Sequence, residues 1–369
     1  MSKFFKSEAV KSIIASLICI VLGVFIGYVV LLMINPAGAT EAILAILKNF
    51  MTFSRANMRL RYFGNTVVKT IPLIMCSLSI LFAYKAGLFN IGVAGQYCVG
   101  ICACLYSALA WNWNWLAAML FAMVCSALYG ALVGLLKSKF NVNEVISGIM
   151  LNWISLYSTN TILTAVKESS SPYTLNLPVT NPSAVIPSFG LEKLFNNNQF
   201  ITIAVPAALI IAVLVYIVLE KTRMGYEIKA TGYNKFAAKY AGMAENKNII
   251  LTLAISGAIA GLGASFLYLT GFEQYVVTSS SVPAMGFNGI AAAFLGGLNP
   301  IGSIFSSFFI QHITAGGAYV DKSIYASQIS DLIAAVIIYL CGFVFFVKTC
   351  MNNAIARSEQ KAAKQGDNK

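Results

Sequence analysis

The chain has 369 residues, of which 58% are apolar and only 10% are charged, whereas charged residues make up about 25% of an ordinary soluble domain. A chain this long and this apolar excludes a water-soluble globular protein and predicts an all-α integral membrane protein solvated by lipid. The net charge of +12 does not predict nucleic acid as a partner. The basic residues lie between and after the apolar runs, where they orient a membrane protein.

Ten apolar runs are candidates for crossing the hydrocarbon. The first follows a short basic segment, 1–11, and is too long for the core of a cleaved signal peptide, which predicts a retained anchor. The eighth is short and rich in glycine, which is typical of broken helices that line cavities in transporters. A transmembrane domain is therefore expected over 12–347, with a basic tail over 348–369. The runs are 12–34, 66–84, 92–110, 115–136, 144–165, 200–219, 249–270, 283–297, 300–319 and 327–347.

Basic residues indicate how these runs are oriented. Seventeen of the 25 lysines and arginines fall on the cytoplasmic side if both termini are cytoplasmic, in agreement with the enrichment of basic residues there. In that arrangement the second to fifth runs and the seventh to tenth runs form two units of opposite direction. We therefore expect about ten transmembrane helices with an inverted four-helix repeat, an arrangement that commonly builds a central transport path.

Two connecting segments differ from ordinary short loops. Segment 41–62 carries four basic residues on the expected outer face and is too charged to span, so an amphipathic helix at the membrane interface is expected. Loop 166–199 contains four prolines and many Ser and Asn residues, which predicts an extracytoplasmic loop over one end of the bundle. Trp111, Trp113 and Trp115 lie between two runs and are expected to anchor that turn at the headgroups.

Catalytic chemistry is disfavoured by what the sequence lacks. The chain has no GxxxxGK[ST] loop, so it is not expected to bind ATP itself. Its eight cysteines form no CxxC pair and its single histidine is His312, so neither a metal site nor a Ser/His/Asp set is expected. We expect a protein without enzymatic activity and without a cofactor of its own.

A secondary transporter driven by an ion gradient is an alternative of a different class. A proton relay would need a connected set of ionisable groups inside the membrane. Lys69, Lys85, Glu273 and Asp331 mostly lie near the ends of runs, where such side chains reach water, and Asp331 is the deepest of them. Because these four residues do not form such a connected set, the sequence does not support an ion-driven transporter.

Loop 220–248 is the most informative polar segment. Its centre is expected to form two short helical pieces broken at Gly232, with Asn234 capping the second piece and Gly242 ending it. The alanines of the second piece leave its surface smooth, which suits a groove on a partner protein. An ordinary basic cytoplasmic loop is the alternative interpretation.

Four stretches carry a resemblance to a known family. The run ATGYNKFAAKYAGM resembles the coupling loop of permeases in the branched-chain amino acid, simple sugar and nucleoside division of ATP-binding cassette (ABC) importers. The forms GLFNIG…GQ and NEVI…MLN are most similar to the nucleoside-type permeases. Ala94 is a departure, since the nucleoside-type motif usually has an acidic residue before GQ. The other stretches are AGLFNIGVAGQY at 86–97, NEVISGIMLN at 143–152 and FNGIAAAFLGGLNPIGSIFSS at 287–307.

The resemblance implies a protein of the bacterial plasma membrane that forms the translocation path of an importer. It implies three kinds of protein partner: a related second permease in a heterodimer, two ABC ATPase subunits that bind the ATP, and an extracytoplasmic solute-binding lipoprotein. A nucleoside is the first solute implied, and a simple sugar or a branched-chain amino acid is the alternative. The residues implied to couple to the ATPase are Gly232, Asn234, Ala237, Ala238, Tyr240 and Gly242.

Five residues are candidates for the substrate path. Asn90 and Gln96 flank a glycine-rich turn, where their amides suit a sugar or a base, although amides and small residues equally stabilise helix packing. Trp153 is a candidate to stack on a nucleobase and Asn152 to hydrogen-bond it. Asn288 on the broken eighth run is a similar candidate.

Overall fold

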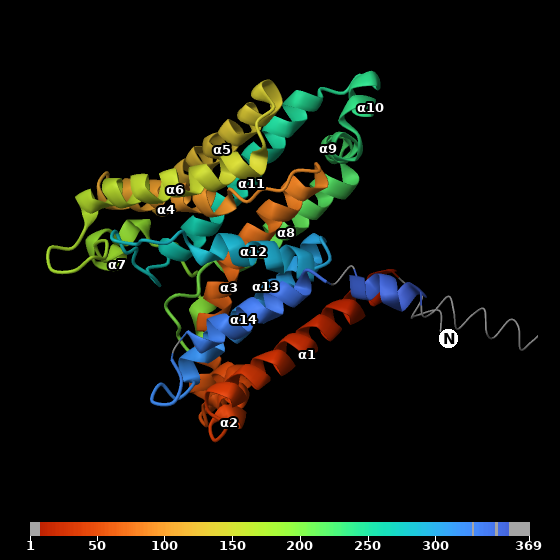
Figure 1. Ribbon diagram of the computed structural model, residues 1–369. Helices are drawn as coiled ribbons and strands as arrows, with labels where there is room; N and C mark the ends of the chain where they lie inside the picture. The colour runs from red at the N-terminus through yellow and green to blue at the C-terminus, as the bar shows by residue number, and fades with distance from the viewer. Residues whose placement is uncertain (1–7, 327, 344–345, 354–369) are drawn as a thin grey trace, which may run out of the picture.

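The computed structural model describes residues 8–326, 328–343 and 346–353. Within these residues the fold is helical, and β pairing is limited to the isolated bridges Lys167–Thr174 and Tyr173–Val276. Figure 1 shows the helices packed into one bundle. The α-helices are α1 (Glu8–Ile34), α2 (Ala39–Lys48), α3 (Ala56–Lys85), α4 (Val93–Leu109), α5 (Trp115–Phe140), α6 (Glu144–Leu163), α7 (Leu177–Thr180), α8 (Ala204–Lys221), α9 (Arg223–Tyr233), α10 (Lys235–Tyr240), α11 (Glu245–Tyr268), α12 (Ala284–Leu295), α13 (Pro300–Gly316) and α14 (Ile329–Cys341).

Each of the ten apolar runs overlaps one of these helices, although residues 327, 344 and 345 of the tenth run lie outside the described part of the chain. Among the described residues, five helices are long and apolar enough to cross a membrane, namely α1, α3, α5, α8 and α11, and α4 and α12 are shorter apolar helices. The largest difference from the prediction is α3, which begins at Ala56 rather than near residue 66. Its first turns carry exposed arginines, so hydropathy alone places the start of the helix too late.

The charged segment before α3 has the amphipathic character expected of it. It folds as α2, a 3-10 turn over Asn49–Thr52, and the exposed start of α3. In α2, Ile43 and Ile46 are buried, whereas Leu44 and Leu47 are exposed. A helix with one buried and one exposed apolar stripe, ending in Lys48, suits a position along the membrane interface.

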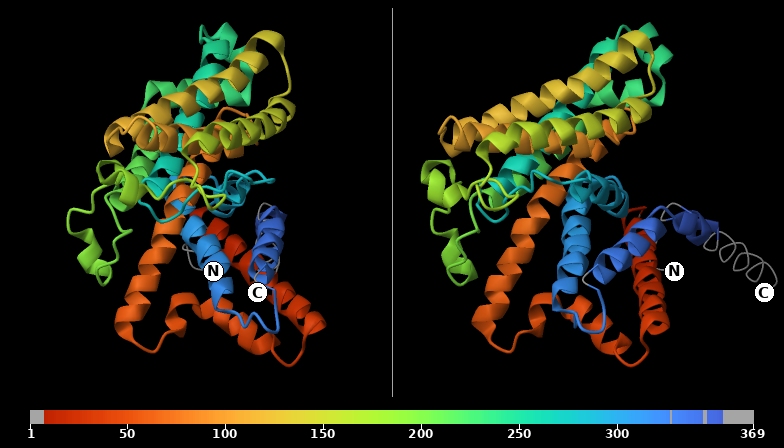
Figure 2. Two further views of the ribbon diagram at one scale, coloured as in Figure 1. Left: turned by 90° about the vertical axis from the view of Figure 1, so that its left-hand side faces the viewer. Right: turned by 60° about the vertical axis from the view of Figure 1, so that its left-hand side comes forward.

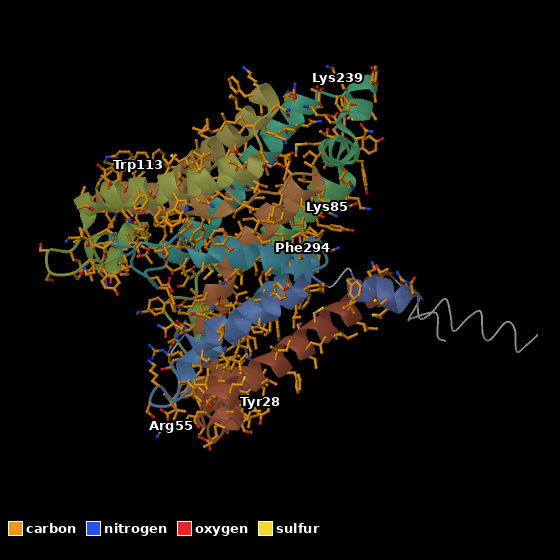
Figure 3. The ribbon with its side chains drawn as sticks, viewed as in Figure 1. Tyr28, Arg55, Lys85, Trp113, Lys239 and Phe294 are labelled. Atoms are coloured by element: carbon orange, nitrogen blue, oxygen red, sulfur yellow. The ribbon has the colours of Figure 1, made fainter. Side chains whose placement is uncertain are left out.

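The two ends of the bundle carry different side chains. Figure 3 shows Lys85 and Lys239 at one end, and Trp113 and Arg55 at the opposite end. The long helices run between these ends (Figure 1). The basic tip built by α9 and α10 therefore lies far from the tryptophan turn between α4 and α5.

Close helix packing at the centre depends on small residues. Helix α11 packs against α3, α4 and α5. A methyl group added at Gly130 of α5 would collide with the backbone oxygen of Leu253, and one added at Gly257 of α11 with that of Ser126. The glycine pairs in these two helices therefore serve packing, as in other membrane bundles.

A second buried cluster lies on the other side of α3. It joins α1, α2, α13 and α14 through Leu31, Ile46, Ile313 and Ile333. Figure 2 shows these helices on one side of the molecule and α4, α5 and α6 on the other. The short helix α12 lies between the two groups and contacts α3, α4, α13 and α14.

Loop 166–199 is folded onto the end of the bundle that carries Trp113. Asn181 donates hydrogen bonds from Nδ2 to the backbone oxygens of Ala108 (2.8 Å) and Trp113 (3.0 Å). The backbone nitrogen of Ile186 donates to the oxygen of Leu269 at 2.9 Å. These bonds fix the loop over the ends of α4 and α11.

Candidate functional site

A cavity of about 430 Å³ opens among α3, α4, α11, α12, α13 and α14. Small-molecule sites are typically about 300–1,000 Å³ and combine apolar walls with a few polar groups. The walls here include Leu267, Met285 and several alanines. The polar lining consists of Lys69, Tyr97, Tyr268, Glu273, Asn288, Gln311, Thr314 and Asp331.

Two buried hydroxyl oxygens in this lining have no hydrogen-bond partner among the described residues. They are the phenol of Tyr97, whose side chain is 1% exposed, and the buried Oγ1 of Thr314. An unpaired buried hydroxyl costs about 1–3 kcal/mol, so such groups are uncommon unless a water or a ligand pairs with them. Both residues line the cavity, although their hydroxyl oxygens are themselves enclosed by protein atoms.

The positive charge of the cavity is neutralised within the chain. Nζ of Lys69 lies 2.9 Å from Oε1 of Glu273 and 5.4 Å from the centre of the Phe272 ring. The ion pair and the cation–π contact hold the ammonium group between α3 and the segment after α11. The charge of Lys69 is thus balanced by Glu273 within the chain.

Of the five residues predicted for the substrate path, Asn288 lines this cavity. Asn90, Gln96 and Asn152 are buried outside it. Nδ2 of Asn90 donates to Oε1 of Gln96 (3.1 Å) and to Oγ of Ser256 (2.8 Å). These bonds join the start of α4 to α11, and a helix-packing role accounts for them.

Asn152 makes a similar bridge between α4 and α6. Its Oδ1 accepts from the backbone nitrogen of Gly95 at 2.7 Å, and its Nδ2 donates to the oxygen of Ile91 at 3.1 Å. Trp153, the next residue, points the other way and is 44% exposed. Its ring stacks on Tyr157 on the outer face of α6, with ring centres 6.1 Å apart.

The predicted coupling segment forms a tip of two short helices. Oδ1 of Asn234 accepts from the backbone nitrogens of Phe236 and Ala237, both at 3.0 Å, so Asn234 caps α10 as expected. Gly242, with φ of +80°, follows the end of that helix. The predicted break at Gly232 is wrong: α9 continues through Gly232, and the helices separate at Asn234.

Gly232 has another role, because it lies against the end of α3. A side chain there would come within 2.6 Å of the backbone of Lys85 and Ala86. The tip is therefore in direct contact with α3, which lines the cavity through Lys69.

Large aromatic side chains cover the surface of the tip. The exposed fractions are 91% for Tyr233, 74% for Phe236 and 95% for Tyr240. Ala238, by contrast, is buried. Exposed aromatic residues on a short helical tip are typical of a surface that another protein covers.

Comparison with known proteins decides the family. The family described as the permease component of the branched-chain amino acid transport system matches residues 62–342. The chain belongs to this permease family. The permease is thus a multi-pass membrane protein and a transport subunit rather than an ATPase.

Three curated relatives show where the permease lies within the family. The guanosine ABC transporter permease protein NupP of Bacillus subtilis (strain 168) is 32% identical over 295 residues, 79% of this permease and 83% of NupP. The nucleoside ABC transporter permease protein NupB of Lactococcus lactis subsp. cremoris (strain MG1363) is 29% identical over 364 residues, 96% of this permease and 97% of NupB. The guanosine ABC transporter permease protein NupQ of Bacillus subtilis is 27% identical over 254 residues, 66% and 77% of the two chains. No solved structure matches the permease significantly.

Sequence patterns did not single out Tyr97, Gln311 and Thr314, although all three line the cavity. An aromatic or a hydroxyl residue in an apolar run is usually part of the core, so its type gives no signal. The useful signal is the presence of two short apolar helices, α4 and α12, that both line the cavity. In transporters such a pair points to the binding site.

Proposed function

We propose that this permease forms the membrane path for nucleosides in an ATP-driven importer. The observation that carries the proposal is the cavity among α3, α4 and α12, with its unpaired Tyr97 hydroxyl and its amide residues Asn288 and Gln311. Such a lining suits a neutral solute with several hydrogen-bond donors and acceptors, as a nucleoside has. The names of NupP and NupB, a guanosine and a nucleoside permease, support the same solute class.

We also propose ten membrane crossings, of which eight form two inverted units, α3 to α6 and α11 to α14, and the other two are α1 and α8. The helix contacts support this pairing, because α4 packs against α11 while α12 packs against α3. Both short helices occupy the second position of their unit. In this arrangement both termini are cytoplasmic, and loop 166–199 is extracytoplasmic.

The tip formed by α9 and α10 is proposed to dock on an ABC ATPase subunit, with Tyr233, Phe236 and Tyr240 as the exposed contacts. Asn234 and Gly242 shape the tip, and Gly232 joins it to α3. ATP would be bound by the partner subunits and no cofactor by this permease. A second permease is the further partner, because NupP and NupQ of one organism are both similar to this chain. An extracytoplasmic solute-binding lipoprotein would complete the assembly.

Uptake in cells tests the solute class. Cells that express the complete assembly would be given labelled guanosine, with unlabelled nucleosides, ribose and leucine as competitors. We expect uptake that depends on this permease and is reduced by other nucleosides, but not by ribose or leucine. Competition by ribose or leucine in place of nucleosides would assign the path to a sugar or an amino acid.

A further inference from the structure

Asp331 is the carboxylate of the cavity that has no cationic partner among the described residues. It lies in the first turn of α14 and lines the cavity. The single lysine of the lining, Lys69, is paired with Glu273 at 2.9 Å. The cavity therefore carries one more negative charge than positive charge.

A structural explanation for Asp331 is incomplete. A carboxylate in the first turn of a helix is stabilised by the helix dipole, which accounts for its position in α14. The dipole does not account for two other residues of the lining, Tyr97 and Thr314, whose buried hydroxyls have no hydrogen-bond partner among the described residues. Asp331 is exposed and shares the lining of this cavity with these buried polar groups. An ionisable side chain in a membrane-spanning bundle is by default a candidate for solute binding.

We propose that the Asp331 carboxylate accepts hydrogen bonds from the vicinal 2′- and 3′-hydroxyl groups of the ribose of the transported nucleoside. The inference rests on the proposed function and assigns one part of its site. An ionised carboxylate is acceptor-only and has two oxygens, so it matches two adjacent hydroxyl donors. Such charge-assisted bonds are about twice as strong as neutral ones.

The same arrangement sets what the path rejects. A free base has no vicinal diol and leaves the carboxylate unpaired. A nucleotide brings a negative phosphate into a cavity whose lysine is already paired. Asn288, Gln311 and the Tyr97 phenol, which can both donate and accept, are left to meet the base.

The test compares wild-type permease with Asp331→Asn in the complete assembly. The measured quantity is the ratio of the inhibition constants of 2′,3′-dideoxyguanosine and guanosine against labelled guanosine uptake. The binding lipoprotein is the same in both strains, so a change in this ratio comes from the permease. Asp321→Asn is the matched control, since Asp321 is an exposed aspartate like Asp331 but does not line the cavity.

We expect the wild-type ratio to be roughly 10 to 100, as for hydrogen bonds to a charged group. The ratio is expected to fall toward one in Asp331→Asn and to stay at the wild-type value in Asp321→Asn. An unchanged ratio in Asp331→Asn, with guanosine still transported, overturns the Asp331 assignment alone. Absence of any nucleoside uptake by the wild-type assembly overturns the proposed function as well.

A second measurement keeps the test decisive if Asp331→Asn does not assemble. Wild-type complex of both permeases and the ATPase, in nanodiscs without the binding lipoprotein, would be titrated with guanosine and with its 2′-deoxy and 3′-deoxy analogues. Loss of affinity with each missing hydroxyl supports the inference. Equal affinity for the three ligands overturns it.

Discussion

The side-chain oxygen of Asn152 in α6 accepts a hydrogen bond from the backbone nitrogen of Gly95 in α4, with 2.7 Å between the two atoms. This bond satisfies a backbone donor near the start of a short helix, where the first amide groups have no partner within the helix. Asn152 therefore acts as a cap supplied by another helix, and it fixes α4 against α6.

Asn152→Ala is expected to destabilise the protein by about 1–3 kcal/mol, because the Gly95 amide is left buried without a partner. The melting temperature of the purified complex in detergent would measure the loss. The apparent KM for guanosine is expected to stay near the wild-type value in the protein that remains folded. A large rise in KM without a change in melting temperature would place Asn152 in the solute path instead.

Tyr97→Phe is expected to raise the KM for guanosine without lowering the stability of the protein. Removing a buried hydroxyl that has no protein partner relieves a desolvation cost, so the melting temperature should be unchanged or slightly higher. If the hydroxyl binds solute, the KM for guanosine rises several-fold. Tyr325→Phe is a matched control, because its hydroxyl is already bonded to the backbone oxygen of Asn35 at 2.6 Å. A lower melting temperature in Tyr97→Phe, with unchanged KM, would contradict this account.

The exposed aromatic residues of the tip are expected to matter for partner binding and not for folding. Tyr233→Ala combined with Phe236→Ala should leave the membrane level of the permease unchanged, since both side chains are exposed. Co-purification of the ATPase should fall at least tenfold if these residues are binding hot spots of roughly 2 kcal/mol or more. Phe189→Ala is the control, because Phe189 is 81% exposed at the other end of the molecule. Normal recovery of the ATPase with the double variant would exclude the tip as the docking surface.

Gly232 also belongs to the tip, but Gly232→Trp would not test the docking surface. The new side chain would collide with the backbone of Lys85 and Ala86, so loss of activity would report disrupted packing between α9 and α3.

Loop 166–199 is expected to loosen at low pH. Hydrogen bonds from Ser171 and Gln274 lower the pKa of Glu168 below its ordinary value of 4.5. A carboxylate with a lowered pKa contributes stability that is present above the ordinary value and lost as the pH falls below it. Protease sensitivity of the loop should therefore rise below about pH 4.5 in wild type. Glu168→Gln has no charge to titrate and should show no such change; the same rise in this variant would assign the effect to other groups.

Some of this architecture could be predicted from local signals. Hydropathy located the helices, because an apolar run of sufficient length has few other stable forms in a membrane. Asn234 and Gly242 were recognisable as helix ends, since each satisfies a specific backbone requirement. The wrong break at Gly232 shows the limit of such signals: this glycine allows α9 to approach α3 closely, and only the fold shows that contact.

The cavity could be predicted only in part. Asn288 was recognisable because it lies on a short, glycine-rich helix. Asn90, Gln96 and Asn152 belong to the same residue class but lie in bonds between helices, and the sequence does not separate these two roles. Tyr97 gave no signal at all, because its importance comes from a missing partner for its hydroxyl, which is a property of the packed structure.

The activity proposed for this permease is the movement of nucleosides across the membrane at the expense of ATP. The most direct measurement is the accumulation of labelled guanosine inside proteoliposomes that hold both permeases and the ATPase, with ATP on the ATPase side and the binding lipoprotein on the other. Accumulation that requires ATP hydrolysis, and that stops when the ATPase is inactivated or this permease is omitted, is the expected result. Guanosine accumulation that follows an imposed ion gradient and is indifferent to ATP would contradict the account.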